Sequence, residues 1–523
     1  MEGEGSRPAS GAIAPQGVTE VNDANEIEAI VMAMREHPGR ENVQTEACQA
    51  LYRLISDNAE NTTRAGIAGA IEALVAVMRR LAESKGVQEE ACTILSRMTI
   101  KNADNKARAS NAGAVEATVA AMQRHIEHTE LQRAACHTLG FIVTDNADNR
   151  AKAGNAGAVE AAVVAMRRHA GSVGLQQAAC FALYRLTWNR LTENTIRAVT
   201  AGAIEAIVVA MCGHSEDQTV QYWACMALDD LVCDDAARTL AGNAGAVKAI
   251  VAAMRRHAHN EKMQHTACLL VGNLTYHNAK NTIRAGSTGV IESVVVIMDT
   301  HVESETVQVG ACMALHNLVI YDTANRARAG SSGAVEALVE AMHRHATSKA
   351  VQEVACLAMG RLINSSAENI ARARNAHAVE AVLAAVSTHA ATEEVQVQAV
   401  AMLYAFGEIC LMGFQKGIPV GMFDRDVPLG VKLLKTVARH EIASAFTSQA
   451  RNLLGVFAAA KSCEGCGTRY ARRSCIRCLD ADSTKVRYCD QACQLMHWSH
   501  PTASHRVECG SHVAARVVSS AAA

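Results

Sequence analysis

The sequence is short of aromatic residues, of proline and of net charge. Phe, Trp and Tyr make up 3% of its 523 residues, and there are six prolines. The apolar half of the composition is therefore mainly Ala, Val, Leu, Ile and Met, which favours helices that pack through small side chains. A formal net charge of -2 provides no overall field toward nucleic acid or an anionic membrane.

Membrane segments and enzyme motifs are also missing from the sequence. No apolar run approaches the roughly 20 residues that cross a bilayer, and the start, MEGEGSRPASGAIAPQG, lacks a basic stretch followed by an apolar one. There is no glycine-rich phosphate-binding motif and no nucleophile elbow. We therefore expect a soluble protein without membrane insertion, export signal, enzymatic activity or small-molecule substrate.

What the sequence does contain is an internal repeat. A motif of the form Ala-Gly-Ala-Ile-Glu returns every 43 to 45 residues, at Gly69, Gly113, Gly157, Gly202, Gly245, Gly289 and Gly333, and in altered form at Asn25 and His377. Nine units of about 44 residues are predicted over residues 21–406. Residues 1–20 are expected to be disordered.

The apolar spacing within a unit is helical. Ile71, Leu74, Val75 and Met78 lie at i, i+3, i+4 and i+7, and the next stripe begins at Val87. An asparagine eight residues before the motif position, as at Asn61, recurs in every unit from the second to the ninth except the sixth, where it is Ala237; it indicates a preceding short helix, which its amide is expected to cap. Because no strand-like alternation competes, the predicted fold is all-α, a right-handed α-solenoid.

Two segments, NKARASNAGAVEATVAAM and LQRAACHTLGFI, resemble the armadillo repeat family, and the resemblance recurs over about 380 residues. The unit length favours armadillo repeats over the two-helix HEAT class. Residues 407–460 are looser, and FTSQARNLLGVF within them suggests a degenerate tenth repeat that caps the array.

A cysteine-rich module is predicted at residues 461–512, followed by a flexible tail at 513–523. Its metal-ligand pairs are Cys463 and Cys466, Cys475 and Cys478, Cys489 and Cys493, and His505 and Cys509. Thiolate and imidazole at these short spacings are the ligands of closed tetrahedral zinc, so two structural Zn²⁺ ions are expected. With all eight ligands used, neither ion keeps the open position that catalysis needs.

The spacing and the segment RYCDQACQLMHW resemble the MYND zinc finger. The resemblance implies Cys463, Cys466, Cys489 and Cys493 on one ion, and Cys475, Cys478, His505 and Cys509 on the other. His500 is the rival to His505. The resemblance also implies binding of proline-containing peptides by Gln494 and Trp498, although Trp498 has packing as an alternative role. A RING-like ubiquitin ligase and a nucleic-acid-associated regulator are the alternatives for the whole protein.

In armadillo proteins the third helices bind extended peptides, and the resemblance places nine residues at the family's asparagine position. They are Arg53, Arg97, Phe141, Arg185, Asp230, Asn273, Asn317, Arg361 and Ala405. No Trp precedes any of them by one turn, so import-signal binding is not expected. The arginines could hold acidic or phosphorylated segments, with Asn273 and Asn317 as further contacts. Solvated arginines along a helix edge are the alternative.

Three periodic features are expected to be structural. Eight cysteines, one per repeat from Cys48 to Cys356, are assigned to the core, and eight histidines from His37 to His389 to the carbonyls at the end of the second helix. A ladder of basic residues, such as Arg64, is expected to pair with glutamates such as Glu72. Both members of the pair change in the sixth unit, to Leu240 and Lys248, which predicts a discontinuity there.

Together these features predict a protein–protein interaction scaffold. The distribution of the 18 cysteines is unlike a disulfide framework, so we expect a reducing compartment, the cytoplasm or the nucleus. Protein or peptide partners are expected, and nucleic acid is not, because the zinc-bound thiolates offset most of the finger's basic excess.

Overall fold

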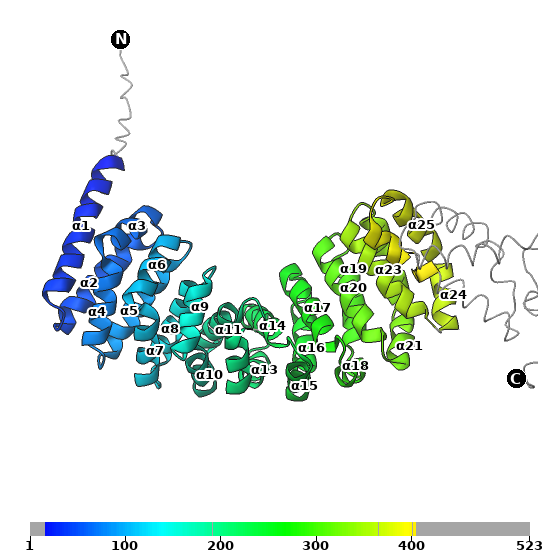
Figure 1. Ribbon diagram of the computed structural model, residues 1–523, viewed down its shortest axis with the longest axis horizontal. Helices are drawn as coiled ribbons and strands as arrows, with labels where there is room; N and C mark the ends of the chain where they lie inside the picture. The colour runs from blue at the N-terminus through cyan, green and yellow to red at the C-terminus, as the bar shows by residue number, and fades with distance from the viewer. Residues whose placement is uncertain (1–15, 191, 365, 400, 404–523) are drawn as a thin grey trace, which may run out of the picture. The chain divides into compact units, whose positions relative to one another are not determined.

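The computed structural model describes residues 16–190, 192–364, 366–399 and 401–403. Within these ranges the secondary structure is helical (Figure 1). The chain divides into two compact units, Met1–His257 and Ala258–Ala523, which we call unit 1 and unit 2. The described part of unit 1 carries helices α1–α16, and that of unit 2 carries α17–α25.

The helices follow a three-helix repeat, as the sequence predicts. The short first helices are α3 (Ala59–Ala68), α6 (Ala103–Ala112), α9 (Ala147–Asn155), α12 (Glu193–Ala201), α15 (Asp235–Ala244), α18 (Ala279–Gly286), α21 (Thr323–Ser331) and α24 (Ala367–Asn375). The second helices are α4 (Ala70–Arg80), α7 (Ala114–Arg124), α10 (Ala158–Arg168), α13 (Ala203–Gly213), α16 (Ala246–Arg256), α19 (Val290–Thr300), α22 (Ala334–Arg344) and α25 (Ala378–Thr388). The third helices are α2 (Glu41–Ile55), α5 (Lys85–Thr99), α8 (Thr129–Val143), α11 (Val173–Thr187), α14 (Gln218–Leu231), α17 (Glu261–Thr275), α20 (Glu305–Val319) and α23 (Lys349–Ile363).

The first repeat differs, because one long helix, α1 (Gln16–Glu36), precedes α2. It begins five residues before the predicted start of the array. In the other repeats a motif residue with positive φ separates the first and second helices; at Gly69 φ is 86°, a left-handed conformation that costs glycine little. Among the described residues, no single helix is long and apolar enough to span a membrane, and α12 with α13 passes that test only as a pair bent by 63°.

Most of the short helices are capped three residues earlier than predicted, and α12 two residues earlier. Asn58, not Asn61, is the N-cap of α3, and its side chain accepts the Asn61 N–H at 2.9 Å. The prediction that Asn61 and its equivalents act as caps is therefore wrong. Spacing alone favoured the asparagine that recurs, whereas the cap itself varies among Asn, Thr, Asp and Ser.

The recurring asparagine instead ties neighbouring repeats together. Asn105 is buried, and its Nδ2 donates to Met98 O in its own repeat at 2.9 Å and to Thr62 O in the preceding repeat at 3.1 Å. The amide occupies the space beside Gly66, where an added Cβ would overlap Oδ1 and lie 2.8 Å from Cγ. We call this arrangement the Asn–Gly lock. The same close approach recurs in the pairs Gly154 and Asn194, Gly286 and Asn325, and Gly330 and Asn369.

Departures from glycine show that the lock is steric. Where Ser110 takes the glycine position, the bond from Asn149 Nδ2 to Lys106 O lengthens to 3.5 Å. Where Val199 takes that position, the next repeat carries Ala237 in place of asparagine. A side chain at the glycine position of one repeat is therefore accompanied, in the next repeat, by a longer asparagine hydrogen bond or by the loss of the asparagine.

Glutamine and histidine satisfy the carbonyls that end each second helix. Gln132 Nε2 donates to Met122 O at 2.7 Å and to His125 O at 3.0 Å, while His125 Nε2 donates to Ala82 O of the preceding repeat at 2.7 Å. The predicted meeting of imidazole and carbonyl is confirmed, with the addition that it bridges repeats. The glutamine pairing recurs at Gln44, Gln88, Gln176, Gln221, Gln308, Gln352 and Gln396.

The periodic cysteines lie in the core, as predicted. Cys48, Cys92, Cys136, Cys180, Cys225, Cys268, Cys312 and Cys356 are all buried as free thiols. Burial raises the pKa of the Cys92 thiol to about 12, so it stays protonated at neutral pH. These thiols act as small packing groups and not as nucleophiles.

The basic ladder pairs mostly within its own helix. Arg64 contacts Glu60 and Arg372 contacts Glu368 one turn away, whereas Arg197 also approaches Glu160 of the preceding repeat at 3.7 Å. The sixth repeat, where the sequence predicts a discontinuity, is the repeat in which the chain divides between the two units.

Candidate functional site

The third helices of unit 1 pack against one another in chain order, from α2 through α5, α8 and α11 to α14. Five residues hold the same register position on them, and we call this set the unit 1 row. It consists of Arg53, Arg97, Phe141, Arg185 and Asp230. In unit 2, α17, α20 and α23 pack in the same manner and carry Asn273, Asn317 and Arg361 at that position.

The arginines of the row have no acidic partner among the residues that the structure describes. Arg97 lies over the Tyr52 ring at 4.7 Å, and Arg53 is exposed. Outside the row, arginines such as Arg124 and Arg168 pair with glutamates of the preceding repeat. The row therefore presents guanidinium groups that are not already neutralised by carboxylates.

Arg185 is the most enclosed of these arginines. Its guanidinium carbon lies 5.0 Å from the centre of the Tyr184 ring, 5.5 Å from Phe181 and 5.6 Å from Trp188. Its Nε is buried without a hydrogen-bond partner. Contact with three rings restricts the orientation of the guanidinium, and its charge remains available to an incoming acidic group.

Aromatic side chains are concentrated around this arginine. Helices α8, α11 and α14 and the residue after α11 carry six of the chain's 18 Phe, Trp and Tyr residues, namely Phe141, Phe181, Tyr184, Trp188, Tyr222 and Trp223. Phe181 links the three helices, with ring centres 4.9 Å from Phe141 and 5.0 Å from Trp223. In a chain with 3% aromatic residues, this cluster is a local exception. Trp188 remains 41% exposed.

The turn after α11 is strained. Asn189 and Arg190 have φ of 85° and 44°, a left-handed conformation that is costly for residues other than glycine. The turn brings Arg190 into an ion pair with Asp229 and places its Nε 3.8 Å from Asp230 Oδ1. The repeat spacing is one residue longer here, 45 from Gly157 to Gly202.

Asp230 is held in an unfavourable environment for a carboxylate. Desolvation, followed by the negative charge of Asp229, raises its pKa to about 7, and Arg190 only partly opposes the shift. Its side chain is 13% exposed, and Oδ2 is buried without a hydrogen-bond partner. Perturbed carboxylates of this kind are enriched at functional sites.

Further cations lie near the row arginines. Lys106 donates to Thr144 O at 3.1 Å; desolvation lowers the pKa of Lys106, Asp145 opposes the shift, and Arg185 adds to it. In unit 2, desolvation lowers the pKa of Arg326, with Arg361 contributing in the same way. Paired like charges of this kind favour an anionic ligand.

Asn317 is less suited to ligand contact than its position predicts. It is 5% exposed, and its Nδ2 donates to Gly272 O of the preceding repeat at 3.0 Å. Arg361 is exposed and Asn273 is half-buried. Of the three predicted groove residues in unit 2, Arg361 is therefore the most available.

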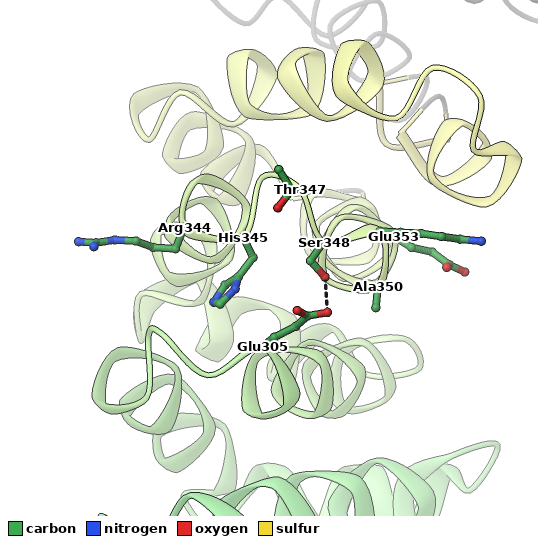
Figure 2. Close-up of a pocket in the computed structure, with 8 residues that line it drawn as sticks. Glu305, Arg344, His345, Thr347, Ser348, Ala350 and Glu353 are labelled. Carbon is green, nitrogen blue, oxygen red and sulfur yellow. Dashed lines mark hydrogen bonds between the residues drawn. The ribbon is translucent and has the colours of Figure 1, made fainter.

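A polar pocket in unit 2 lies away from the register position, at the start of α23 (Figure 2). Ser348 caps α23 by accepting the Val351 N–H and donates to Glu305 of the preceding repeat at 2.6 Å. Ser304 makes the corresponding bond to Glu261 at 2.6 Å. Because this arrangement recurs, we assign it to packing between repeats.

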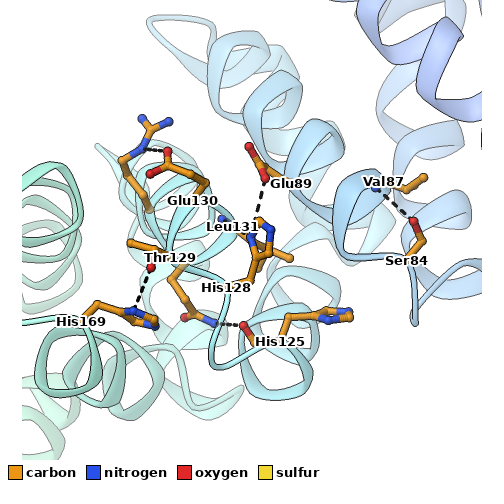
Figure 3. A network of polar contacts seen from close by, with 11 residues as sticks. Ser84, Val87, Glu89, His125, His128, Thr129, Glu130, Leu131 and His169 are labelled. Carbon is orange, nitrogen blue, oxygen red and sulfur yellow. Dashed lines mark hydrogen bonds and ion pairs between the residues drawn. The ribbon is translucent and has the colours of Figure 1, made fainter. Parts of the chain in front are cut away.

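A second polar network joins the repeats around α8 in unit 1 (Figure 3). His128 Nδ1 accepts the Leu131 N–H at 3.2 Å and thereby caps α8. An accepting Nδ1 carries no proton, so the approach of Glu89 to this atom at 3.7 Å is not a charged pair. Thr129 Oγ1 lies 3.0 Å from His169 Nδ1 of the next repeat. This network is likewise structural.

The eight ligands of the predicted zinc site, with His500, Gln494 and Trp498, lie outside the described residues. Among the residues that are described, no group of three His, Cys, Asp or Glu side chains is arranged to hold a metal ion. Two zinc ions in the C-terminal module remain a prediction from the sequence.

Comparisons with known proteins agree with the repeat architecture. A family model described as the LRRK2 ARM repeat matches residues 238–411, so this part of the chain is an armadillo-like repeat region. No curated protein matches the chain. The fold is an all-helical repeat solenoid similar to a crystal structure of an engineered protein. The two sequences are 22% identical, the match covers 82% of this chain and 98% of the other, and the TM-score is 0.69.

A second similar structure comes from work on a phosphorylation switch that controls the interaction between cadherin and β-catenin. The two sequences are 17% identical, the match covers 87% of this chain and 94% of the other, and the TM-score is 0.62. At these identities the likeness shows the fold alone.

Proposed function

We propose that this protein is a non-enzymatic interaction scaffold whose unit 1 row binds an extended, acidic protein segment. The observation that carries the proposal is that Arg53, Arg97 and Arg185 lack acidic partners within the described structure, while Arg124, Arg168, Arg197 and Arg256 elsewhere on the repeats pair with glutamates. Carboxylates and phosphates bind guanidinium in a bidentate manner, and such charge-assisted bonds are the strong ones. Repeat arrays of this architecture commonly serve protein–protein interaction.

Arg185 is the proposed anchor of the site. An unbound arginine loses rotamer freedom when it binds, but the rings of Phe181, Tyr184 and Trp188 already restrict this one. A pre-organised group loses less entropy on binding. The nearby Lys106 adds positive charge and, as a like charge, does not neutralise the Arg185 guanidinium.

We further propose that the C-terminal module is a MYND-type finger with two structural zinc ions, which recruits a proline-containing peptide through Gln494 and Trp498. The support for this is the ligand spacing in the sequence. A partner that spans both sites would gain effective concentration. Cytoplasm or nucleus remains the proposed location, because the periodic cysteines are buried free thiols.

The acidic-segment proposal is tested by fluorescence anisotropy with two labelled 12-residue peptides on the full chain. One carries Glu and the other Lys at every third position, with Gly and Ser between. We expect the Glu peptide to bind more tightly, and Arg185→Gln to weaken it roughly tenfold, the effect of about 1.5 kcal/mol for one charged hydrogen bond.

The matched control is Arg124→Gln, because Arg124 is engaged with Glu83 away from the row. It should leave the affinity within twofold. Equal binding of the two peptides, or an unchanged affinity in the double variant Arg97→Gln with Arg185→Gln, would refute the proposed function.

A further inference from the structure

We propose that the unit 1 row recognises a segment with four determinants at intervals of about three residues: an acidic, an apolar, a second acidic and a basic side chain. They would face Arg97, Phe141, Arg185 and Asp230 in turn. This inference rests on the proposed function and specifies the partner by its chemistry. The last four positions of the row carry an arginine, a phenylalanine, a second arginine and an aspartate, and an extended chain meets them in that order.

The spacing follows from two lengths. Packed helices lie about 8–10 Å apart, and α5, α8, α11 and α14 pack in consecutive contact. A ligand in the extended polyproline II conformation rises about 3.1 Å per residue with about three residues per turn, so every third side chain points the same way. One repeat therefore corresponds to about three residues of ligand, and the four determinants span about ten residues.

The second position suits an apolar side chain. Phe141 is half-buried between His137, at 6.1 Å between ring centres, and Phe181 at 4.9 Å. Burial, with a smaller contribution from Arg133, lowers the pKa of His137 to about 4, so the imidazole is neutral at physiological pH. A charged ligand side chain would find no counterion in these rings and would be desolvated against them.

The fourth position suits a basic side chain. Asp230 is at the register position of α14, and its buried Oδ2 has no hydrogen-bond partner. Arg190 contacts Asp229, and its Nε lies 3.8 Å from Asp230 Oδ1, too far for a hydrogen bond, so the 13% of the Asp230 side chain that remains exposed can meet an incoming donor. The adjacent rings of Tyr184 and Trp223, with centres 5.8 Å apart, would add a cation–π contribution for Lys or Arg.

The order of charges along the row provides the specificity. A uniformly acidic segment would be attracted to Arg97 and Arg185 but would place a carboxylate against Asp230. A uniformly basic segment would be repelled by both arginines. Only a segment that changes sign after the second acid matches all four positions, and like-charge contact penalises the others.

The test uses labelled peptides on the full chain by fluorescence anisotropy. The pattern peptide is Glu-Gly-Ser-Phe-Gly-Ser-Glu-Gly-Ser-Lys, and it is compared with its reversed order because the row does not set chain direction. The better of the two is then changed from Lys to Glu, from Phe to Ser, and to a version with two-residue intervals. On the wild type we expect each change to weaken binding at least fivefold.

Asp230→Asn separates recognition from folding, because it preserves the shape of the side chain. The affinities of this variant for the pattern peptide and for its Lys-to-Glu version should lie within twofold of each other. The variant should still bind the Lys-to-Glu version, which shows that the site is folded. Asp104→Asn, a change on the exposed first turn of α6, should keep the wild-type preference.

The outcomes distinguish the two proposals. If acidic peptides bind and Arg185→Gln weakens them, but the Lys-to-Glu change has no effect on the wild type, this inference is wrong and the proposed function stands. Equal binding of the two-residue and three-residue versions also overturns the inference. If no acidic peptide binds, both proposals fail.

Discussion

Gly66→Ala should destabilise the array, although alanine is the better helix former. The added Cβ would overlap Asn105 Oδ1 and lie 2.8 Å from its Cγ, so the amide must leave its position between two repeats. It then loses its bonds to Thr62 O at 3.1 Å and Met98 O at 2.9 Å, both of which are buried. The structure offers no alternative position that keeps both bonds, because the two carbonyls belong to different helices.

The expected net cost is about 1–5 kcal/mol. A buried polar group that loses its hydrogen-bond partner costs about 1–3 kcal/mol, and two bonds are lost. Replacing glycine by alanine within a helix returns about 1 kcal/mol. Gly86→Ala in α5 is the matched control, since nothing lies within 4 Å of its added Cβ, and it should be neutral or slightly stabilising.

Urea unfolding of the full chain by circular dichroism measures the two variants, and hydrogen exchange locates the effect in α3 and α6. The double variant Gly66→Ala with Asn105→Ala resembles the natural pair Val199 and Ala237, so its cost should fall short of the summed single costs by about 1 kcal/mol or more. If Gly66→Ala costs no more than Gly86→Ala, or if the double variant is additive, the lock is not the steric device described above.

Three further outcomes are expected. Gln132→Leu leaves two helix-end carbonyls without their donor, and should lower the free energy of unfolding by about 2–4 kcal/mol in the same urea assay. The folded-state pKa of Asp230, about 7, lies above its ordinary value, so the folded protein binds this proton more tightly. Its stabilising contribution is present below about pH 4 and is lost as the pH rises to 7, so Asp230→Asn should reduce the loss in urea midpoint between pH 5 and 8. The full chain should contain two zinc ions by mass spectrometry, and Cys489→Ser should lower that number; a metal-free wild type would contradict the zinc assignment.

The periodic features of the fold were predictable from the sequence because each is repeated at a fixed interval. The glycine turn at Gly69, the buried Cys92 and the terminal His125 each depend on their own helix and recur every 43 to 45 residues. In these cases the local physical chemistry and the repeat period agree.

Contacts between repeats were less predictable. The residue type of Asn61 suits a helix cap, whereas its bonds to Asp23 and Leu54 of other helices depend on how the helices pack. Gln132 recurs with the same period and was overlooked, since a glutamine in a helix has no obvious partner in sequence. The aromatic cluster could not be predicted either, because Phe141, Phe181 and Trp223 lie some 40 residues apart and meet only across neighbouring helices.

The Asn–Gly lock also bears on how such a chain can change its length. Four repeats, those whose first helices are α3, α9, α18 and α21, carry both the asparagine donor for the unit before and the glycine recess for the unit after, so each of them is complementary to a copy of itself. Excising or duplicating one whole 44-residue unit between two such neighbours would rejoin a donor with a recess and leave every bond of the lock intact. Val199 and Ala237 fit each other but not the corresponding residues of the other repeats, so excision of the repeat that carries Ala237 would bring valine against asparagine. The array is therefore free to grow or shrink at most of its joints, and restricted in length at this one.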